Sequence, residues 1–481
     1  MTSMDIIIVG GGVIGQAIAY SFSEDGLRVG LVDDQCSGNG KASTAAGGML
    51  GAFGEVSYDR DTEMDEVELE YRIHAAKKYP NWLKDIEEAA DRSIFHSQGT
   101  LIVANRAGVN DLASIKKIAV ALERHNEKYE WVDPEQLADY KPDKDYIAYK
   151  ALLIGNEGAV DTTDLMESLI QANRNRGIVS IVGKTESLIV SSGKIEGIML
   201  SDERKLFAPR VILCAGVGTQ NIIEHTDKMR LPEVMAIKGS SLLVSTTKPI
   251  QYTLRTPNRE SCGLHLVPRN NGQIYIGATH RNILSKSSVR HTENITLDEI
   301  NYLIQGATQQ LSSELRGSVI LNSYYGYRPA TLDRFPIVGE TEVEGLLVAT
   351  GTYRNGILMA PIIAEVIRAT INGAEHPLKL LFTPYSRNMQ IESLGRNYWL
   401  DNGMQHLLKF IKHQTNVSPT YSENDVNLFT TSLLKILASN NERYVNFRDE
   451  INKVLAGNVD LASLRRLYNR IVLFEKRNKN S

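Results

Sequence analysis

The sequence has few cysteines, no long apolar run and no excess of charge of one sign. Its 3 cysteines, Cys36, Cys214 and Cys262, are widely spaced, which excludes a disulfide framework and a thiolate metal site. We therefore expect a reducing, cytoplasmic environment and no bound metal. The sequence contains no stretch of about 18 apolar residues, the length needed to span a bilayer. With 53 Lys and Arg against 57 Asp and Glu, the chain also lacks the positive surface that nucleic acid requires.

The chain is long enough to form more than one lobe. It has 481 residues, of which 42% are hydrophobic and 23% charged, the composition of a globular protein. An apolar strand at 5–9 runs into three glycines, and a helix is expected from Val13 to about Gly26. A second strand at 29–32 ends at Asp33. The chain thus opens with a strand, a turn, a helix and a strand.

Further elements follow from periodicity and turn residues. A strand pair broken at Gly99 is expected over 94–105, and Asp161 or Thr162 is expected to cap a helix that reaches about Asn175. Helices are expected at 62–92 (one or two), 109–124, 357–371 and, beyond residue 400, at 400–413, 423–439, 441–456 and 460–475. Strands are expected at 178–182, 185–190, 194–200, 211–216 and, as a hairpin turned by Asn271 and Gly272, at 264–268 and 273–277.

A glycine fingerprint connects the first strand to the first helix. Gly10 suits a tight turn, Gly12 lets a pyrophosphate approach the backbone, and Gly15 lets the helix pack on the strand. Asp33, 18 residues after Gly15, can accept hydrogen bonds from ribose hydroxyls and would repel a 2′-phosphate. The pattern predicts a dinucleotide site for FAD or NAD and disfavours NADP.

Three separated segments resemble the D-amino-acid oxidase family of flavoproteins. The small-residue run 42–50 resembles the loop that follows the flavin, and 211–216 resembles a later strand of the nucleotide-binding sheet. The pair 326–339 and 349–361 resembles the glycine oxidase branch, of the thiazole-biosynthesis type. The resemblance covers about 4–375 and implies FAD as the cofactor.

The resemblance implies an α/β fold with interleaved domains. A Rossmann-type FAD-binding domain is expected from 1–90, 150–220 and 325–375, and a sheet-rich substrate domain from 91–149 and 221–324. A C-terminal all-α appendage, 376–481, is longer than a simple glycine oxidase requires. The residues that the fingerprint and the resemblance place at the cofactor are Gly10, Gly12, Val13, Ile14, Gly15, Asp33, Ser43, Thr44, Ala46, Gly47, Gly48, Met49, Ala215, Gly216, Gly351, Arg354, Asn355, Gly356, Ile357 and Leu358.

Four residues are implied as catalytic. Arg328 matches the arginine that binds the substrate carboxylate, for which a planar guanidinium is suited. Arg354 and Tyr353 match positions beside the flavin, although a loop salt bridge and an ordinary packed tyrosine are alternatives. His265 replaces a pocket tyrosine and His280 an apolar residue, so the substrate is not fixed, and both histidines could equally be structural.

The resemblance implies oxidation of a C–N bond of an amine or amino acid by hydride transfer to flavin N5. Dioxygen is the expected acceptor, giving hydrogen peroxide. An alternative is a flavoprotein that modifies a side chain of a partner protein, as in the maturation of a tryptophylquinone cofactor, with the basic C-terminal region as the docking surface. A flavin-binding protein without turnover is a third reading. An oligomer is compatible with all three.

Overall fold

The computed structural model describes residues 4–34, 40–58, 62–108, 110–226, 229, 231–232, 234–258, 263–283, 294–331 and 335–384. Almost all of these residues belong to one compact unit, Met1–Asn282 with Glu293–Arg387. The helices predicted beyond residue 400, and the cysteines at 36 and 262, lie outside the described residues. None of the helices in these ranges is long and apolar enough to cross a membrane.

The glycine fingerprint follows an inner strand of a six-stranded sheet. Its strands, in spatial order, are β17 (Ile337–Glu340), β18 (Leu346–Thr350), β10 (Val211–Leu213), β1 (Ile6–Val9), β2 (Val29–Asp33) and β6 (Val179–Val182). All neighbours are parallel except β17 and β18. Buried β-branched runs, such as the four residues of β1, suit a sheet covered on both faces. The parallel order brings the carboxyl ends of β1, β2 and β10 together, where ligands bind in such folds.

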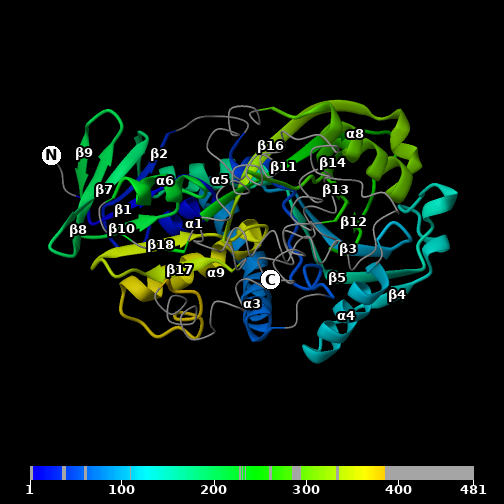
Figure 1. Ribbon diagram of the computed structural model, residues 1–481, viewed down its shortest axis with the longest axis horizontal. Helices are drawn as coiled ribbons and strands as arrows, with labels where there is room; N and C mark the ends of the chain where they lie inside the picture. The colour runs from blue at the N-terminus through cyan, green and yellow to red at the C-terminus, as the bar shows by residue number, and fades with distance from the viewer. Residues whose placement is uncertain are drawn as a thin grey trace, which may run out of the picture. The chain divides into compact units, whose positions relative to one another are not determined.

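Helices cover this sheet. They are α1 (Val13–Ser21), α3 (Glu63–Ala90), α5 (Thr162–Asn175), α6 (Gly218–Glu224) and α9 (Gly356–Ile371). In Figure 1, α1 and α9 lie together beside the sheet, and α9 also contacts α3. The predicted Asp161 cap is confirmed, since its side chain accepts from the amides of Thr163 and Asp164. The first helix ends earlier than expected, at Ser21, and a turn then leads to Gly26.

A nine-stranded sheet forms the second layer. It contains β15 (Arg281–Ile283), β11 (Val234–Ser245), β14 (Gln273–Gly277), β13 (His265–Pro268), β12 (Thr253–Arg255), β3 (His96–Ala104), β5 (Lys150–Val160) and β4 (Glu130–Val132) in that order, with β16 (Val319–Thr331) paired to β11. The predicted hairpin is confirmed, with Asn271 at φ 57° and Gly272 at φ 69°. The mixed α/β fold with a Rossmann-type sheet is likewise confirmed.

Smaller elements complete the unit. The helices are α2 (Ala42–Ala45), α4 (Asp111–Arg124) and α8 (Leu297–Gln305); the short turns are Pro134–Gln136, Lys144–Tyr146, Asn270–Gly272, Gly306–Leu311 and Ser313–Gly317. A three-stranded sheet consists of β7 (Thr185–Ser191), β8 (Lys194–Leu200) and β9 (Lys205–Phe207).

Local geometry corrects some of the expected elements. The strand pair expected at 94–105 is one strand, β3, because Gly99 at φ 91° forms a bulge rather than a break. The run 42–50 begins with a single helical turn, α2, rather than a continuous loop. β5 and the whole length of β16 run in the nine-stranded sheet. The domain boundaries themselves stay a prediction.

Candidate active site

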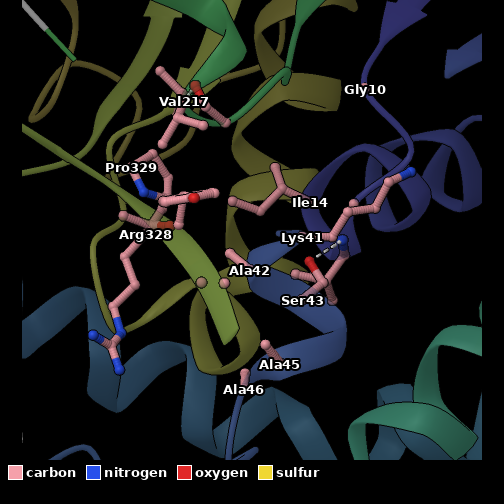
Figure 2. A pocket seen from close by; sticks show the side chains of 18 of the residues that line it. Gly10, Ile14, Lys41, Ala42, Ser43, Ala45, Ala46, Val217, Arg328 and Pro329 are labelled. Atoms are coloured by element: carbon pink, nitrogen blue, oxygen red, sulfur yellow. Dashed lines mark hydrogen bonds between the residues drawn. The ribbon is translucent and has the colours of Figure 1, made fainter. Parts of the chain in front are cut away.

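A cavity of about 590 Å³ begins at the carboxyl edge of the six-stranded sheet and extends to the nine-stranded sheet. Residues of β1, β2, α2 and the segment after β10 line one part, and residues of β13, β16 and the segment before α9 line the other. Figure 2 shows Gly10, Ile14 and Lys41 on one side of it and Arg328 and Pro329 on the other. Segments that are far apart in the sequence therefore share one space.

The three fingerprint glycines differ in what surrounds them. Gly10 has φ 106°, and a Cβ there would lie 2.5 Å from the carbonyl oxygen of Cys214. A Cβ on Gly15 would lie 1.9 Å from the Gly10 oxygen, so the helix needs glycine to pack there. A Cβ on Gly12 would meet only Ser43 Oγ, at 3.2 Å. Because Gly12 and Ser43 both line the cavity, this Cβ would lie at the cavity wall. Gly12 is therefore the glycine that leaves room for a phosphate at the N-terminus of α1.

Asp33 braces the glycine turn. Its Oδ2 accepts from the Gly11 amide at 2.7 Å, and its Oδ1 accepts from Lys41 Nζ at 2.6 Å. Lys41 also lies 3.4 Å from Asp34 Oδ1. A carboxylate at the end of the second strand is the group that accepts hydrogen bonds from ribose hydroxyls in dinucleotide-binding folds. The sequence did not identify Lys41, which lies directly before the small-residue run.

The small-residue run is held by side chains behind it. Tyr275 donates to the Ala45 carbonyl at 2.8 Å, Arg269 to the Gly47 carbonyl at 3.0 Å, and Thr162 to the Ala46 carbonyl at 3.1 Å. These bonds fix the run along the cavity wall. Because its residues are small, a flat ligand can approach its backbone closely.

Arg328 presents a guanidinium that has no carboxylate partner in the part of the chain that the structure describes. It comes from β16, and a Cβ on the neighbouring Gly239 of β11 would lie 2.1 Å from its Nη2. Its Nη1 donates to the Thr279 carbonyl at 3.2 Å. Of the two arginines that line the cavity among the described residues, it alone meets no acid. Arg328 can therefore take a ligand carboxylate in the fork geometry of a guanidinium.

Arg354 belongs to a closed ring of four residues, and the loop salt bridge left open above is present. Its Nη2 lies 2.7 Å from Glu55 Oε2, and its Nη1 donates to Asn258 Oδ1 at 3.1 Å. Arg255 closes the ring, donating to Glu55 Oε1 at 3.0 Å and to Asn258 Oδ1 at 2.7 Å. Although burial opposes it, Arg354 and Arg255 hold the pKa of Glu55 well below its usual range. Arg354 is thus neutralised within the protein.

His265 is buried, neutral and an acceptor toward the cavity. Its Nδ1 lies 3.3 Å from the Gly263 carbonyl, so Nδ1 carries the proton and Nε2 accepts. The ring stacks on Tyr275 at 5.9 Å. Burial, with Arg255 and Arg328 adding to it, lowers the pKa of His265 to about 3. The side chain is therefore uncharged at neutral pH and cannot bind a carboxylate as a cation.

Tyr353 adopts an unusual backbone conformation at the cavity rim. Its φ is 50°, a region that a non-glycine residue rarely occupies. Its amide donates to the Pro329 carbonyl at 2.8 Å, and its hydroxyl lies 3.0 Å from His280 Nδ1. The pair joins the segment before α9 to the chain that follows β14.

Most predicted site residues line the cavity, and four do not. Gly15 packs against Gly10, Thr44 is exposed, Gly351 packs against Thr331, and Leu358 is buried in the core. The lining residues are Gly10, Gly12, Val13, Ile14, Asp33, Ser43, Ala46, Gly47, Gly48, Met49, Ala215, Gly216, His265, Arg328, Tyr353, Arg354, Asn355, Gly356 and Ile357. Their roles toward cofactor and substrate stay predictions.

Comparison with known proteins agrees with this geometry. Residues 5–370 match the DAO family, described as FAD dependent oxidoreductase. The chain belongs to this family. Hydrogen cyanide synthase subunit HcnC of Pseudomonas aeruginosa is 26% identical over 408 residues, covering 78% of this chain and 94% of that protein. Glycine oxidase of Geobacillus kaustophilus is 26% identical over 401 residues, covering 81% of this chain and 98% of that protein.

The fold is also that of a solved structure. The crystal structure of glycine oxidase from Geobacillus kaustophilus matches with a TM-score of 0.69 and 23% identity, covering 80% of this chain and 99% of that chain. The predicted FAD-dependent oxidoreductase, with FAD as cofactor, is confirmed. The residues present fit the cofactor, since Gly12 opens the wall at the start of α1 and Asp33 stands at the end of β2.

Proposed function

We propose that this oxidoreductase oxidises the C–N bond of a small amino acid that carries one carboxylate, with dioxygen as acceptor and hydrogen peroxide as product. The observation that supports this best is the contrast between the two cavity arginines. Arg354 is paired with Glu55 at 2.7 Å, whereas Arg328, within the described ranges, donates to a carbonyl and meets no acid. The cavity therefore offers one guanidinium to one carboxylate.

The residues then assign the two ends of the substrate. Arg328 binds the carboxylate, and the acceptor Nε2 of His265 takes an N–H of the amine. Because its pKa is about 3, His265 orients the amine but is a poor base for an ammonium ion. The substrate accordingly reacts as its neutral amine, and FAD when bound accepts the hydride. Water hydrolyses the resulting imine, while the buried ring of Glu55, Arg255, Asn258 and Arg354 keeps this end of the cavity rigid.

Release of hydrogen peroxide from a panel of amino acids, each matched with the amine that lacks its carboxylate, tests this function. We expect turnover of amino acids, a rise of kcat/KM with pH as the amine loses its proton, and little turnover of the matched amines. Equal turnover of both sets would contradict the role of Arg328. Silence across the panel from flavin-loaded protein would contradict the proposal and favour the protein-modifying alternative. The cytoplasmic location, an oligomer and a partner for the C-terminal region stay predictions.

A further inference from the structure

Glu157 is a buried carboxylate that none of the roles above uses. It lies near the end of β5 and is 5% exposed. Its Oε1 accepts from the amides of Phe53 and Gly54, at 2.6 and 3.1 Å. Its Oε2 has no hydrogen-bond partner within the described part of the chain. Oε1 therefore anchors the buried irregular segment that carries Glu55. When Glu157 is ionised, Oε2 carries negative charge without a hydrogen bond from the described residues.

The unpartnered oxygen faces the back of the cavity wall. A Cβ on Gly51 would lie 2.8 Å from Glu157 Oε2, and a Cβ on Gly54 would lie 3.1 Å from it. Gly51 lines the cavity. The backbone of Gly51 therefore lies between Oε2 and the cavity, and Gly51 itself has no side chain to separate them. At low dielectric, a charge at this distance acts strongly on a charge inside the cavity.

The groups around Glu157 have opposing effects on its pKa. Burial, reinforced by Glu55, raises its pKa to about 7, while the two amides and Arg255 oppose the rise. The ring contains two positive charges, on Arg255 and Arg354, and one negative charge, on Glu55. Arg72 of α3 acts on Glu55 as well. Together, the ring and Glu157 carry no net charge when Glu157 is ionised and one positive charge when it is protonated.

We propose that Glu157 takes up one proton from solvent on Oε2 when the bound cofactor undergoes two-electron reduction. The cofactor receives two electrons, either as a hydride from a substrate or together with a proton from solvent, and the further proton on Oε2 also comes from solvent. The ring and Glu157 together then change from no net charge to one positive charge as negative charge is placed in the cavity. Glu157 is a positioning residue, because it lies behind Gly51 and is not among the residues that line the cavity. The inference depends on the FAD site and not on the identity of the substrate.

Spectroelectrochemical titration of flavin-loaded protein from about pH 5.5 to about pH 9 tests this, with reduction by mediators and no substrate. For the wild type, we expect the midpoint potential to fall more steeply with pH above about pH 7 than below it. Glu157→Gln keeps Oε1 but cannot ionise, so it should lack the steeper part and have a more positive potential at high pH. At low pH the two proteins should agree. The matched control is Glu130→Gln, an exposed position on the adjacent strand β4, which should follow the wild type.

Curves of equal slope for wild type and Glu157→Gln across the range would overturn the proposal. If Glu157→Gln fails to fold or to hold FAD, the wild type alone decides the matter by redox-difference infrared spectroscopy. Reduction should then produce the carbonyl stretch of a protonated carboxylic acid and remove a carboxylate band. A spectrum without that gain overturns the proposal. Because no amino acid is present, a failure here is separate from a failure of the proposed function.

Discussion

Gly239→Ala should damage substrate binding without disturbing the fold. Gly239 lies on β11 opposite Gly326 of β16, and its backbone is in an ordinary region that alanine adopts without strain. The added methyl carbon would lie 2.1, 2.3 and 2.4 Å from Nη2, Cζ and Nη1 of Arg328. The guanidinium, at the end of a flexible side chain, has to move to accommodate it.

The displacement sets the size of the effect. Ordinary contact begins at 3.4 Å, so the nearest nitrogen has to move by about 1.3 Å, the difference between 3.4 and 2.1 Å. A displacement of about 1 Å of a positioning group costs about 10²-fold in rate, equivalent to about 2.7 kcal/mol. We therefore expect kcat/KM for amino acids to fall about a hundredfold.

Two measurements separate this effect from general damage. Binding of simple carboxylate inhibitors such as glycolate, followed by flavin absorbance, should weaken in parallel with kcat/KM, whereas Tm and FAD affinity should stay at wild-type values. Gly155→Ala on β5, where an added Cβ meets nothing within 4 Å, is the matched control and should change none of these. Unchanged carboxylate affinity in Gly239→Ala would refute the assignment of Arg328.

Three further changes probe other parts of the site. Gly12→Ala should fold normally, because the added Cβ meets only Ser43 Oγ. It should bind FAD at least about tenfold more weakly in equilibrium dialysis, because Gly12 lines the cavity. Equal FAD affinity would contradict the role of Gly12 at the phosphate. Glu55→Ala removes the acid from the buried guanidinium of Arg255 and from the half-buried one of Arg354. It should cost about 3–5 kcal/mol, seen as a lower Tm, and Asn258→Asp in the same chain should restore part of this loss. The pKa of His265 is lowered to about 3 from an unfolded value of about 6.5, so its stabilisation is present above about pH 6.5 and is lost as pH falls toward the folded value. Between about pH 6.5 and about pH 5 the free energy of unfolding should fall by about 2 kcal/mol for this reason. The Tm of the wild type should therefore fall more over this range than that of His265→Leu. Parallel curves of Tm against pH would contradict the buried neutral state of His265.

The sequence predicted the elements whose cause is local. Gly10 and Gly15 make close backbone contacts that only glycine permits, and Asp161 caps a helix that starts at the next residue. The hairpin at Asn271 and Gly272 needs positive φ angles that this pair adopts readily. In each case, neighbouring residues determine the conformation, so a short pattern is sufficient.

The ring around Arg354 could not be predicted in this way. Glu55 and Arg255 are separated by 200 residues and Asn258 and Arg354 by 96, and no spacing rule connects them. The resemblance placed Arg354 beside the cofactor, but the carboxylate that neutralises it lies in a segment without a recognisable motif. The same holds for Glu157, whose partners are backbone amides 103 and 104 residues away. Only the folded chain shows which cations are already paired.

This pairing connects the nine-stranded sheet to the segment that joins β18 of the six-stranded sheet to α9. Arg255 lies on β12 of the nine-stranded sheet, while Arg354 lies between β18 and α9, the helix that begins at the cavity. Because Glu55 and Asn258 join both guanidinium groups, a shift of either sheet would expose a buried charge that has no other acid within the ring. The cofactor end and the carboxylate end of the cavity are therefore held in fixed register. Loss of one ring member should accordingly weaken FAD binding and substrate binding together, even where the substituted residue touches only one of the two ligands.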